Sequence, residues 1–176
     1  MMPHLRKRHI KASLVKGLKF SPIVALFGHR QVGKTTLAAE LAESYTTLDL
    51  DQLRIESETD PMAFLQRNAG RPLAIDECQM SPKLFPAMKE WVRTHPKPGQ
   101  LLLTGSVRFS SRKAIRESLT GRLIAWELLP MDLSEAFQAP LPDTVATLLK
   151  AQSVEIELKR SAYVTQAAIQ RYMKQG

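Results

Sequence analysis

Residues 28–36 read GHRQVGKTT, a turn bounded by glycines and followed by a lysine and two threonines. Glycine at both ends of the turn, Gly28 and Gly33, lets the backbone turn tightly and approach a ligand closely. Successive N–H groups and the start of the following helix place partial positive charge inside such a turn, which suits a phosphate group. The residues therefore predict a phosphate-binding loop of the G-x-x-x-x-G-K-[ST] pattern.

The side chains of this loop predict a nucleoside triphosphate with Mg²⁺ as the ligand. Lys34 is expected to reach the β- and γ-phosphates, Thr35 to hold Mg²⁺ through its hydroxyl, and Thr36 to contact the α-phosphate. A GTPase would carry an N-K-x-D segment that reads the base, and the chain has none, which favours ATP. The predicted nucleotide-binding residues are Gly28, His29, Arg30, Gln31, Val32, Gly33, Lys34, Thr35 and Thr36.

Two acids follow a short apolar run further along the chain. Residues 72–76 read PLAID and deliver Asp76 and Glu77 at the end of an expected strand, where ligands bind in open α/β sheets. Asp76 suits a position beside Mg²⁺, and Glu77 suits a base that orients and deprotonates an attacking water. Hydrolysis is favoured over transfer to a small molecule, because a small-molecule kinase would normally lack this glutamate and carry an arginine-rich lid.

Further polar groups follow the expected strand in LLLTGS, where Thr104 or Ser106 is placed to contact the γ-phosphate or the attacking water. We favour Ser106 slightly, since Thr104 is expected to be part of the strand; an ordinary strand-end turn is the alternative. Hydrolysis by such a site often also needs a cation that neutralises the negative charge of the transition state, supplied by the same chain or by a neighbouring chain. Arg122 and Arg108 are the candidates, and a solvated surface arginine is the competing interpretation.

The elements that must position these groups alternate between short β-rich runs and longer helical ones. This alternation is typical of a parallel sheet wrapped by helices, so we predict an α/β fold. The expected strands are residues 23–27, 45–51, 72–76, 100–104 and 123–128. The expected helices are residues 1–20, 36–44, 60–68, 83–94, 112–119 and a short one in 131–137.

The formal net charge of +8 is partly due to a basic cluster near the start of the chain, formed by Arg6, Lys7, Arg8, His9 and Lys11. Such a cluster permits binding to nucleic acid or to an acidic protein partner. It also fits the solvated face of an amphipathic helix, which we favour. No apolar run reaches the length of about 18 residues that a membrane span needs, and no secretory signal is recognisable, so a cytoplasmic protein without a membrane partner is expected.

The chain has a single cysteine, Cys78, which excludes an internal disulfide and a metal site built from cysteines. Its place beside the two acids predicts a small buried side chain that packs behind a strand, rather than a redox group.

The same motifs, in this order, resemble the prokaryotic AAA-type ATPases that pair an N-terminal ATPase domain with a C-terminal domain of unknown function related to restriction-type nucleases. The likeness covers residues 5 to 138. It is carried by GHRQVGKTTL, YTTLDLD, LAIDECQMSPKLFPAMK, LLLTGS, ESLTGRL and ELLPMDLSEAF.

The resemblance implies an AAA-like P-loop fold with a five-stranded parallel sheet, ATP as the nucleotide, and a tendency to self-associate into a homo-oligomer. It implies the Walker A roles for Lys34 and Thr35, the Walker B roles for Asp76 and Glu77, and a sensor role for Ser106 or Thr104. Arg122 matches the Gly-Arg step of the family. We therefore expect an ATP hydrolase that acts as a switch for a partner; the alternatives are a nucleotide- or nucleic-acid-binding module with little turnover and, less favoured, a small-molecule kinase.

The end of the chain departs from this family, whose members usually continue well beyond this length. We expect residues 1–138 to form the ATPase domain and residues 139–176 a linker with a remnant of the C-terminal domain, left by an internal deletion. Pro142-Asp143 and Glu157-Leu158-Lys159 formally match a nuclease pattern. A metal nuclease needs its carboxylates converged on one sheet, so a charged edge strand is the favoured interpretation.

Overall fold

The computed structural model describes residues 6–69, 71–106, 115, 118–138, 166–167, 170 and 173. The chain divides into two compact units. The larger is His9–Pro130, and the smaller combines Met1–Arg8 with Met131–Gly176. No helix of the described residues has the length and apolar character to span a membrane.

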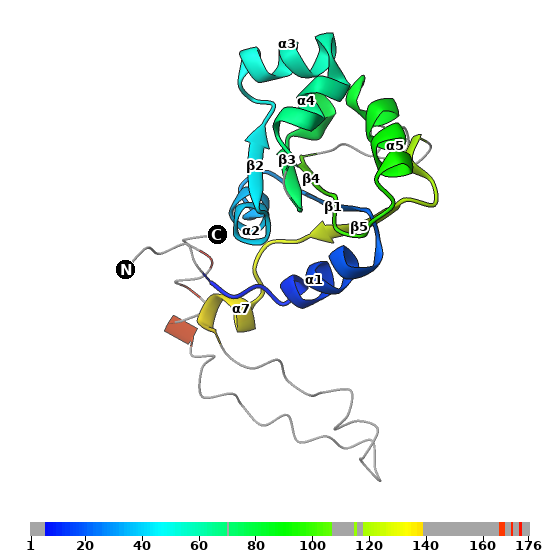
Figure 1. Ribbon diagram of the computed structural model, residues 1–176. Coiled ribbons are helices and arrows are strands. Elements are labelled where there is room, and N and C mark those ends of the chain that lie inside the picture. The colour runs from blue at the N-terminus through cyan, green and yellow to red at the C-terminus, as the bar shows by residue number, and fades with distance from the viewer. Residues whose placement is uncertain are drawn as a thin grey trace. The chain divides into compact units, whose positions relative to one another are not determined.

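The larger unit is built on a five-stranded parallel sheet in the order β2-β3-β4-β1-β5 (Figure 1). The strands are β1 (Ile23–Gly28), β2 (Ser44–Thr47), β3 (Leu73–Asp76), β4 (Leu101–Gly105) and β5 (Leu123–Leu128). Every residue of the three central strands β1, β3 and β4 is buried, as expected for a parallel sheet covered on both faces. The predicted α/β fold with a five-stranded parallel sheet is confirmed.

The helices of the larger unit are α1 (Ile10–Phe20), α2 (Lys34–Leu41), α3 (Asp51–Thr59), α4 (Pro61–Arg67) and α5 (Leu84–Thr94), with a short 3-10 turn at Cys78–Met80. Residues 115, 118 and 119 are also helical. The start of α4 follows the predicted chemistry, because the side chain of Asp60 accepts a hydrogen bond from the N–H of Ala63 at 2.9 Å and Pro61 is the first helical residue.

Two apolar clusters pack on the sheet, because successive side chains of a strand point to opposite faces. In β1, Ile23 and Ala25 pack into the cluster that includes residues of α4 and α5, while Val24 and Leu26 pack into the cluster that includes residues of α1 and α2. Cys78 is completely buried in the first cluster, and burial raises the pKa of its thiol. The predicted packing role of Cys78 is confirmed.

Three expected elements differ clearly from the structure in their bounds. The expected helix 36–44 is α2, which begins at Lys34 and ends at Leu41, and Ser44 already belongs to β2. The expected strand 45–51 ends at Thr47, and its last residues form a turn into α3, a helix that was not predicted from the sequence. Leu48 turns inward and is completely buried, which places the following acids outside the sheet. The expected helix 1–20 begins only at Ile10 among the described residues.

The smaller unit contains α7 (Leu133–Phe137), whose start is capped by the Asp132 side chain through the N–H of Glu135 at 2.8 Å. Arg8 Nε lies 3.0 Å from Glu135 Oε2, and both side chains are buried. Arg8 therefore does not belong to a solvated helix face, and the basic cluster was interpreted wrongly at this position. The nuclease-like residues 142–143 and 157–159 lie outside the described residues.

Candidate active site

The turn between β1 and α2 has the shape that a phosphate loop needs. Gly33 at φ 95° and Gln31 at φ 64° both adopt left-handed backbone conformations. Gly28 is required for a different reason, since a Cβ there would lie 2.3 Å from the carbonyl oxygen of Leu128 on β5. The expected conformational freedom thus applies at Gly33, whereas Gly28 allows close packing of the loop against the neighbouring strand.

The start of α2 presents backbone N–H groups to this turn. Gly33 is the residue at the helix boundary, and no side chain among the described residues caps it. The first N–H groups of a helix have no partner inside the helix and carry partial positive charge. Thr35 and Thr36 lie in this first turn and are exposed. The loop can therefore receive an anion at the helix start.

Lys34 lies inside the turn, with 5% of its surface exposed. Its Nζ donates a hydrogen bond to the carbonyl oxygen of His29 at 2.7 Å. Burial lowers the pKa of Lys34, and the nearby charges of Glu77 and Asp76 partly oppose this shift. The buried ammonium is paired with a neutral carbonyl, an arrangement from which it can turn to an incoming anion.

Asp76, at the end of β3, is the most heavily hydrogen-bonded group of the site, and 4% of its surface is exposed. Its Oδ2 accepts hydrogen bonds from Thr35 Oγ1 at 2.6 Å and from the Tyr45 hydroxyl at 2.8 Å. Its Oδ1 accepts from Thr104 Oγ1 and from the N–H of Glu77 at 3.1 Å. Burial alone would raise the pKa of Asp76, but hydrogen bonds from Thr104, Thr35 and Tyr45 outweigh it and hold the pKa below its usual value.

Glu77 follows in a left-handed conformation, at φ 52°. Its Oε2 accepts hydrogen bonds from Ser106 Oγ at 3.2 Å, from the N–H of Ser106 at 3.4 Å, and from the side-chain amide of Gln79. The end of β4 therefore gives each acid its own hydroxyl. Thr104 contacts Asp76, and Ser106 contacts Glu77.

Two contributors to this network are absent from the sequence prediction. Tyr45 lies on β2, the strand beside β3, and its partner in the register is Ala74. Burial, and secondarily the hydrogen bond and charge of Asp76, raise the pKa of Tyr45. Gln79 lies in the 3-10 turn after the acids. Tyr45 could have been found only from the order of the strands, which places β2 beside β3. Gln79 could have been found as a polar residue two positions after Glu77.

Arg122 lies at the other edge of the sheet. Its carbonyl oxygen accepts hydrogen bonds from the N–H of Ile23 at 3.2 Å and from Ser21 Oγ at 3.1 Å, where β1 begins. Gly28 is five residues further along β1, roughly 16 Å away at the usual rise of a strand. Arg122 is therefore separated from the phosphate loop of its own chain. Arg108 lies outside the described residues.

The remaining loop residues face outward. His29, Arg30 and Gln31 are exposed, and Val32 is half-buried, with its side chain against Gly28. The phosphate loop, both acids and the hydroxyls of Thr104 and Ser106, at and just after the end of β4, meet at the carboxyl edge of the sheet.

Comparisons with known proteins find one matching family, described as an AAA domain (AAA_14), over residues 20–137. Two curated relatives are the uncharacterized proteins Rv2008c of Mycobacterium tuberculosis (strain ATCC 25618 / H37Rv) and Mb2031c of Mycobacterium bovis (strain ATCC BAA-935 / AF2122/97). Each is 34% identical over 127 residues, which cover 70% of this chain. The match spans 29% of the length of these relatives.

Two solved structures show a low level of similarity to this chain. A crystal structure of a DNA replication initiation factor is 15% identical, with a TM-score of 0.44, and the match covers 82% of this chain and 55% of that one. Domain III of the replication initiation protein DnaA from Thermotoga maritima is 18% identical, with a TM-score of 0.47 and coverage of 80% and 72%. Likeness at this level says nothing about activity.

Proposed function

Since this chain belongs to the AAA_14 family of AAA domains, which are P-loop NTPases, we propose that it binds ATP with Mg²⁺ in the loop 28–36 and hydrolyses it. The site lies in the part of the chain that the family covers. Three groups of residues share the reaction: one binds the phosphates, one holds the metal, and one activates the attacking water.

The loop and Lys34 bind the phosphates in this proposal. Phosphate oxygens accept hydrogen bonds from the N–H groups at the start of α2, where the helix dipole favours negative charge. Lys34 exchanges the carbonyl oxygen of His29 for the β- and γ-phosphate oxygens. Its burial favours the exchange, because a charge interaction is stronger where water is excluded.

The hydroxyl of Thr35 and the carboxylate of Asp76 fit Mg²⁺, which prefers oxygen ligands and usually takes only one or two from carboxylates. No group of three or more His, Cys, Asp or Glu side chains that could hold a metal occurs in the residues with a described structure, so phosphate oxygens and water would complete the shell. Bound Mg²⁺ would neutralise charge on the phosphates. Asp76 orients the hydroxyl of Thr35 toward this position.

Glu77 is the proposed base. Its carboxylate orients a water molecule and accepts a proton from it while the water oxygen bonds to the γ-phosphorus. The bond from that phosphorus to the β–γ bridging oxygen breaks, and ADP leaves with the electron pair. Ser106 and Gln79 hold the carboxylate by hydrogen bonds, and so reduce the number of orientations that it can adopt.

ATP-driven switching of a partner is the proposed use of this reaction, with residues 1–138 as the ATPase domain. The observation that supports the ATPase proposal most directly is the hydrogen bond from Thr35 Oγ1 to Asp76 Oδ2, at 2.6 Å, because it joins the phosphate loop to the acidic strand. The same two groups are those proposed to meet at the metal.

Phosphate release from ATP tests the proposal. The wild-type chain is expected to release phosphate. Glu77→Gln is expected to bind ATP normally, while the rate of phosphate release falls by about a hundredfold or more, the usual contribution of a general base to the rate. Glu90→Gln, which removes an exposed carboxylate on α5, is the matched control and should retain the wild-type rate. Binding without turnover in the wild type would instead favour a nucleotide-binding module, and an unchanged rate in Glu77→Gln would reject Glu77 as the base.

A further inference from the structure

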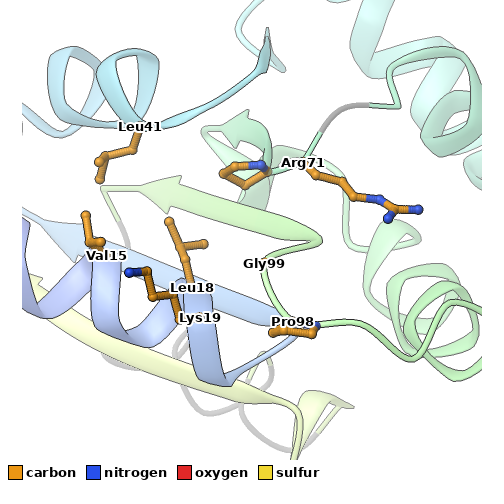
Figure 2. A pocket seen from close by; sticks show the side chains of 8 residues that line it. Val15, Leu18, Lys19, Leu41, Arg71, Pro98 and Gly99 are labelled. Atoms are coloured by element: carbon orange, nitrogen blue, oxygen red, sulfur yellow. The ribbon is translucent and has the colours of Figure 1, made fainter.

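A groove of ≈310 Å³ lies away from the phosphate loop, at the amino edge of the sheet. Its apolar lining comes from the end of α1, from the end of α2 and from the residue before β3, namely Val15, Leu18, Leu41 and Pro72 (Figure 2). The volume is near the lower end of the usual range for ligand pockets, about 300–1,000 Å³. This groove has room for one or two apolar side chains of a partner.

Two cations lie beside the apolar lining. Lys19 and Arg71 both line the groove, and Figure 2 shows their side chains extending in opposite directions from it. Neither side-chain cation makes a hydrogen bond or ion pair with a residue in the described ranges. Glu43 accepts its hydrogen bond from the backbone N–H of Arg71, at 2.8 Å, rather than from the guanidinium. The groove therefore suits an apolar side chain with acids on both sides.

The outer face of α3 has this composition. Ile55 is 62% exposed, although exposed isoleucines are costly in water. Asp51 and Glu58 lie four residues before and three residues after it, so all three share one face of the helix. Asp51 Oδ1 already lies 2.6 Å from Arg54 Nη2 of the same helix, and its carboxylate has further lone pairs that can accept from a second cation. The two acids are separated by about 10 Å along the helix axis. Leu50, just before the helix, is also 57% exposed.

We propose that α3 of a second copy of this chain docks in the groove, with Ile55 against the apolar lining and Asp51 and Glu58 beside Lys19 and Arg71. The α3 helix cannot fill the groove of its own chain, because it follows the carboxyl end of β2 whereas the groove lies at the amino edge (Figure 1). The contact joins two different surfaces. It is therefore a head-to-tail contact, and each added copy can bind the next copy through the same pair of surfaces.

One helix in one groove is a small interface. Stable complexes bury about 1,600 Å² in total, far more than a single helix face provides, so the association is weak and depends on protein concentration. Complementary charge here mainly sets the orientation and the encounter rate. The interface does not include the phosphate loop, and it forms without nucleotide.

Analytical ultracentrifugation of the full chain without nucleotide, over a range of concentrations, tests the proposal. The average mass of the wild type is expected to rise with concentration and the rise to weaken at high salt. Lys19→Glu with Arg71→Glu places acids against the acids of α3, and Asp51→Lys with Glu58→Lys places bases against the bases of the groove. Each double variant alone should associate about tenfold more weakly or worse.

Mixing the two double variants gives the decisive result. The acidic groove of the first variant can then bind the basic α3 of the second, and the basic groove of the second can bind the acidic α3 of the first. The equimolar mixture should regain association. Lys89→Glu, which reverses an exposed charge on α5, is the matched control and should associate as the wild type does. Circular dichroism and thermal melting establish that each variant is folded.

Three results would overturn the proposal. These are a wild type that is monomeric at every concentration, double variants that associate as the wild type does, and a mixture that stays monomeric although both variants are folded. The first would leave the groove to a different partner. None of them bears on ATP binding, which is measured separately.

Discussion

Thr35 Oγ1 donates a hydrogen bond of 2.6 Å to Asp76 Oδ2, across 41 positions of sequence. The bond joins the start of α2, which follows β1, to the end of β3, although β4 lies between β1 and β3 in the sheet. Tyr45 and Thr104 donate to the same carboxylate. The site is thus organised around one buried acid, and its hydroxyl partners are the natural targets for mutation.

Tyr45→Phe should raise the Mg²⁺ concentration needed for tight ATP binding by about tenfold, the usual effect of removing a group that orients a metal-binding side chain. The reason is that the Tyr45 hydroxyl donates to the same Oδ2 of Asp76 as Thr35 does, and so helps to fix the orientation of that carboxylate. Titration of Mg²⁺ at fixed ATP measures the effect. Nucleotide affinity in EDTA serves as the internal control and should not change, whereas an unchanged Mg²⁺ dependence would show that Tyr45 does not orient Asp76.

Ser106→Ala and Thr104→Val should have different consequences, since the two hydroxyls contact different acids. Loss of the Ser106 hydroxyl frees Glu77 and should lower the hydrolysis rate by about tenfold, with ATP affinity unchanged. Loss of the buried Thr104 hydroxyl, which contacts Asp76, should instead raise the Mg²⁺ concentration that is needed for tight ATP binding. Steady-state rates and binding isotherms separate the two outcomes, and identical effects of both substitutions would contradict this division.

The free energy of unfolding should depend on the ionisation of Asp76. Its pKa is lowered in the folded chain, so the stabilisation is present above the unfolded pKa of about 3.9 and is lost as the pH falls through the folded pKa. Asp76→Asn should cost about 1.5–3 kcal/mol at neutral pH, the worth of hydrogen bonds to a charged group. In urea unfolding, the difference from the wild type should shrink below about pH 4. A constant difference at all pH values would contradict the lowered pKa.

Arg122→Ala should leave the affinity for Mg²⁺ and ATP unchanged, because Arg122 lies at the edge of the sheet opposite the phosphate loop. Any contribution to hydrolysis would have to come from a neighbouring chain, and the rate per chain would then rise with protein concentration. Binding isotherms of both proteins check the first expectation. A loss of affinity of more than about tenfold would place Arg122 at its own nucleotide site.

The sequence was sufficient for the sheet and for the two chemical motifs. The apolar runs that became β1, β3 and β4 are buried on both faces and so are continuous in the sequence. Because parallel strands end at one edge, Asp76 and the loop could be expected to lie near each other. The positions of Ser106 and Thr104 followed from the same rule.

Other features depend on the order of the strands or on local turns. Tyr45 reaches Asp76 only because β2 lies beside β3, and a periodic pattern carries no information about neighbours in a sheet. The segment YTTLDLD alternates polar and apolar residues and was interpreted as one strand, but Leu48 is buried and the chain turns there into α3. The α3 helix gives little apolar signal, since Ser57 is its only fully buried residue among those described.

Calorimetric titration of Mg²⁺ and ATP into the folded chain, in parallel with Lys34→Ala, tests the central claim most directly. We predict saturable uptake of one nucleotide per chain by the wild type, and a loss of affinity of about a hundredfold or more in Lys34→Ala, because removal of a buried cation leaves the phosphate charge uncompensated. Circular dichroism confirms that both proteins are folded. The absence of any uptake by folded wild-type protein, or equal affinity in the two proteins, would contradict the account.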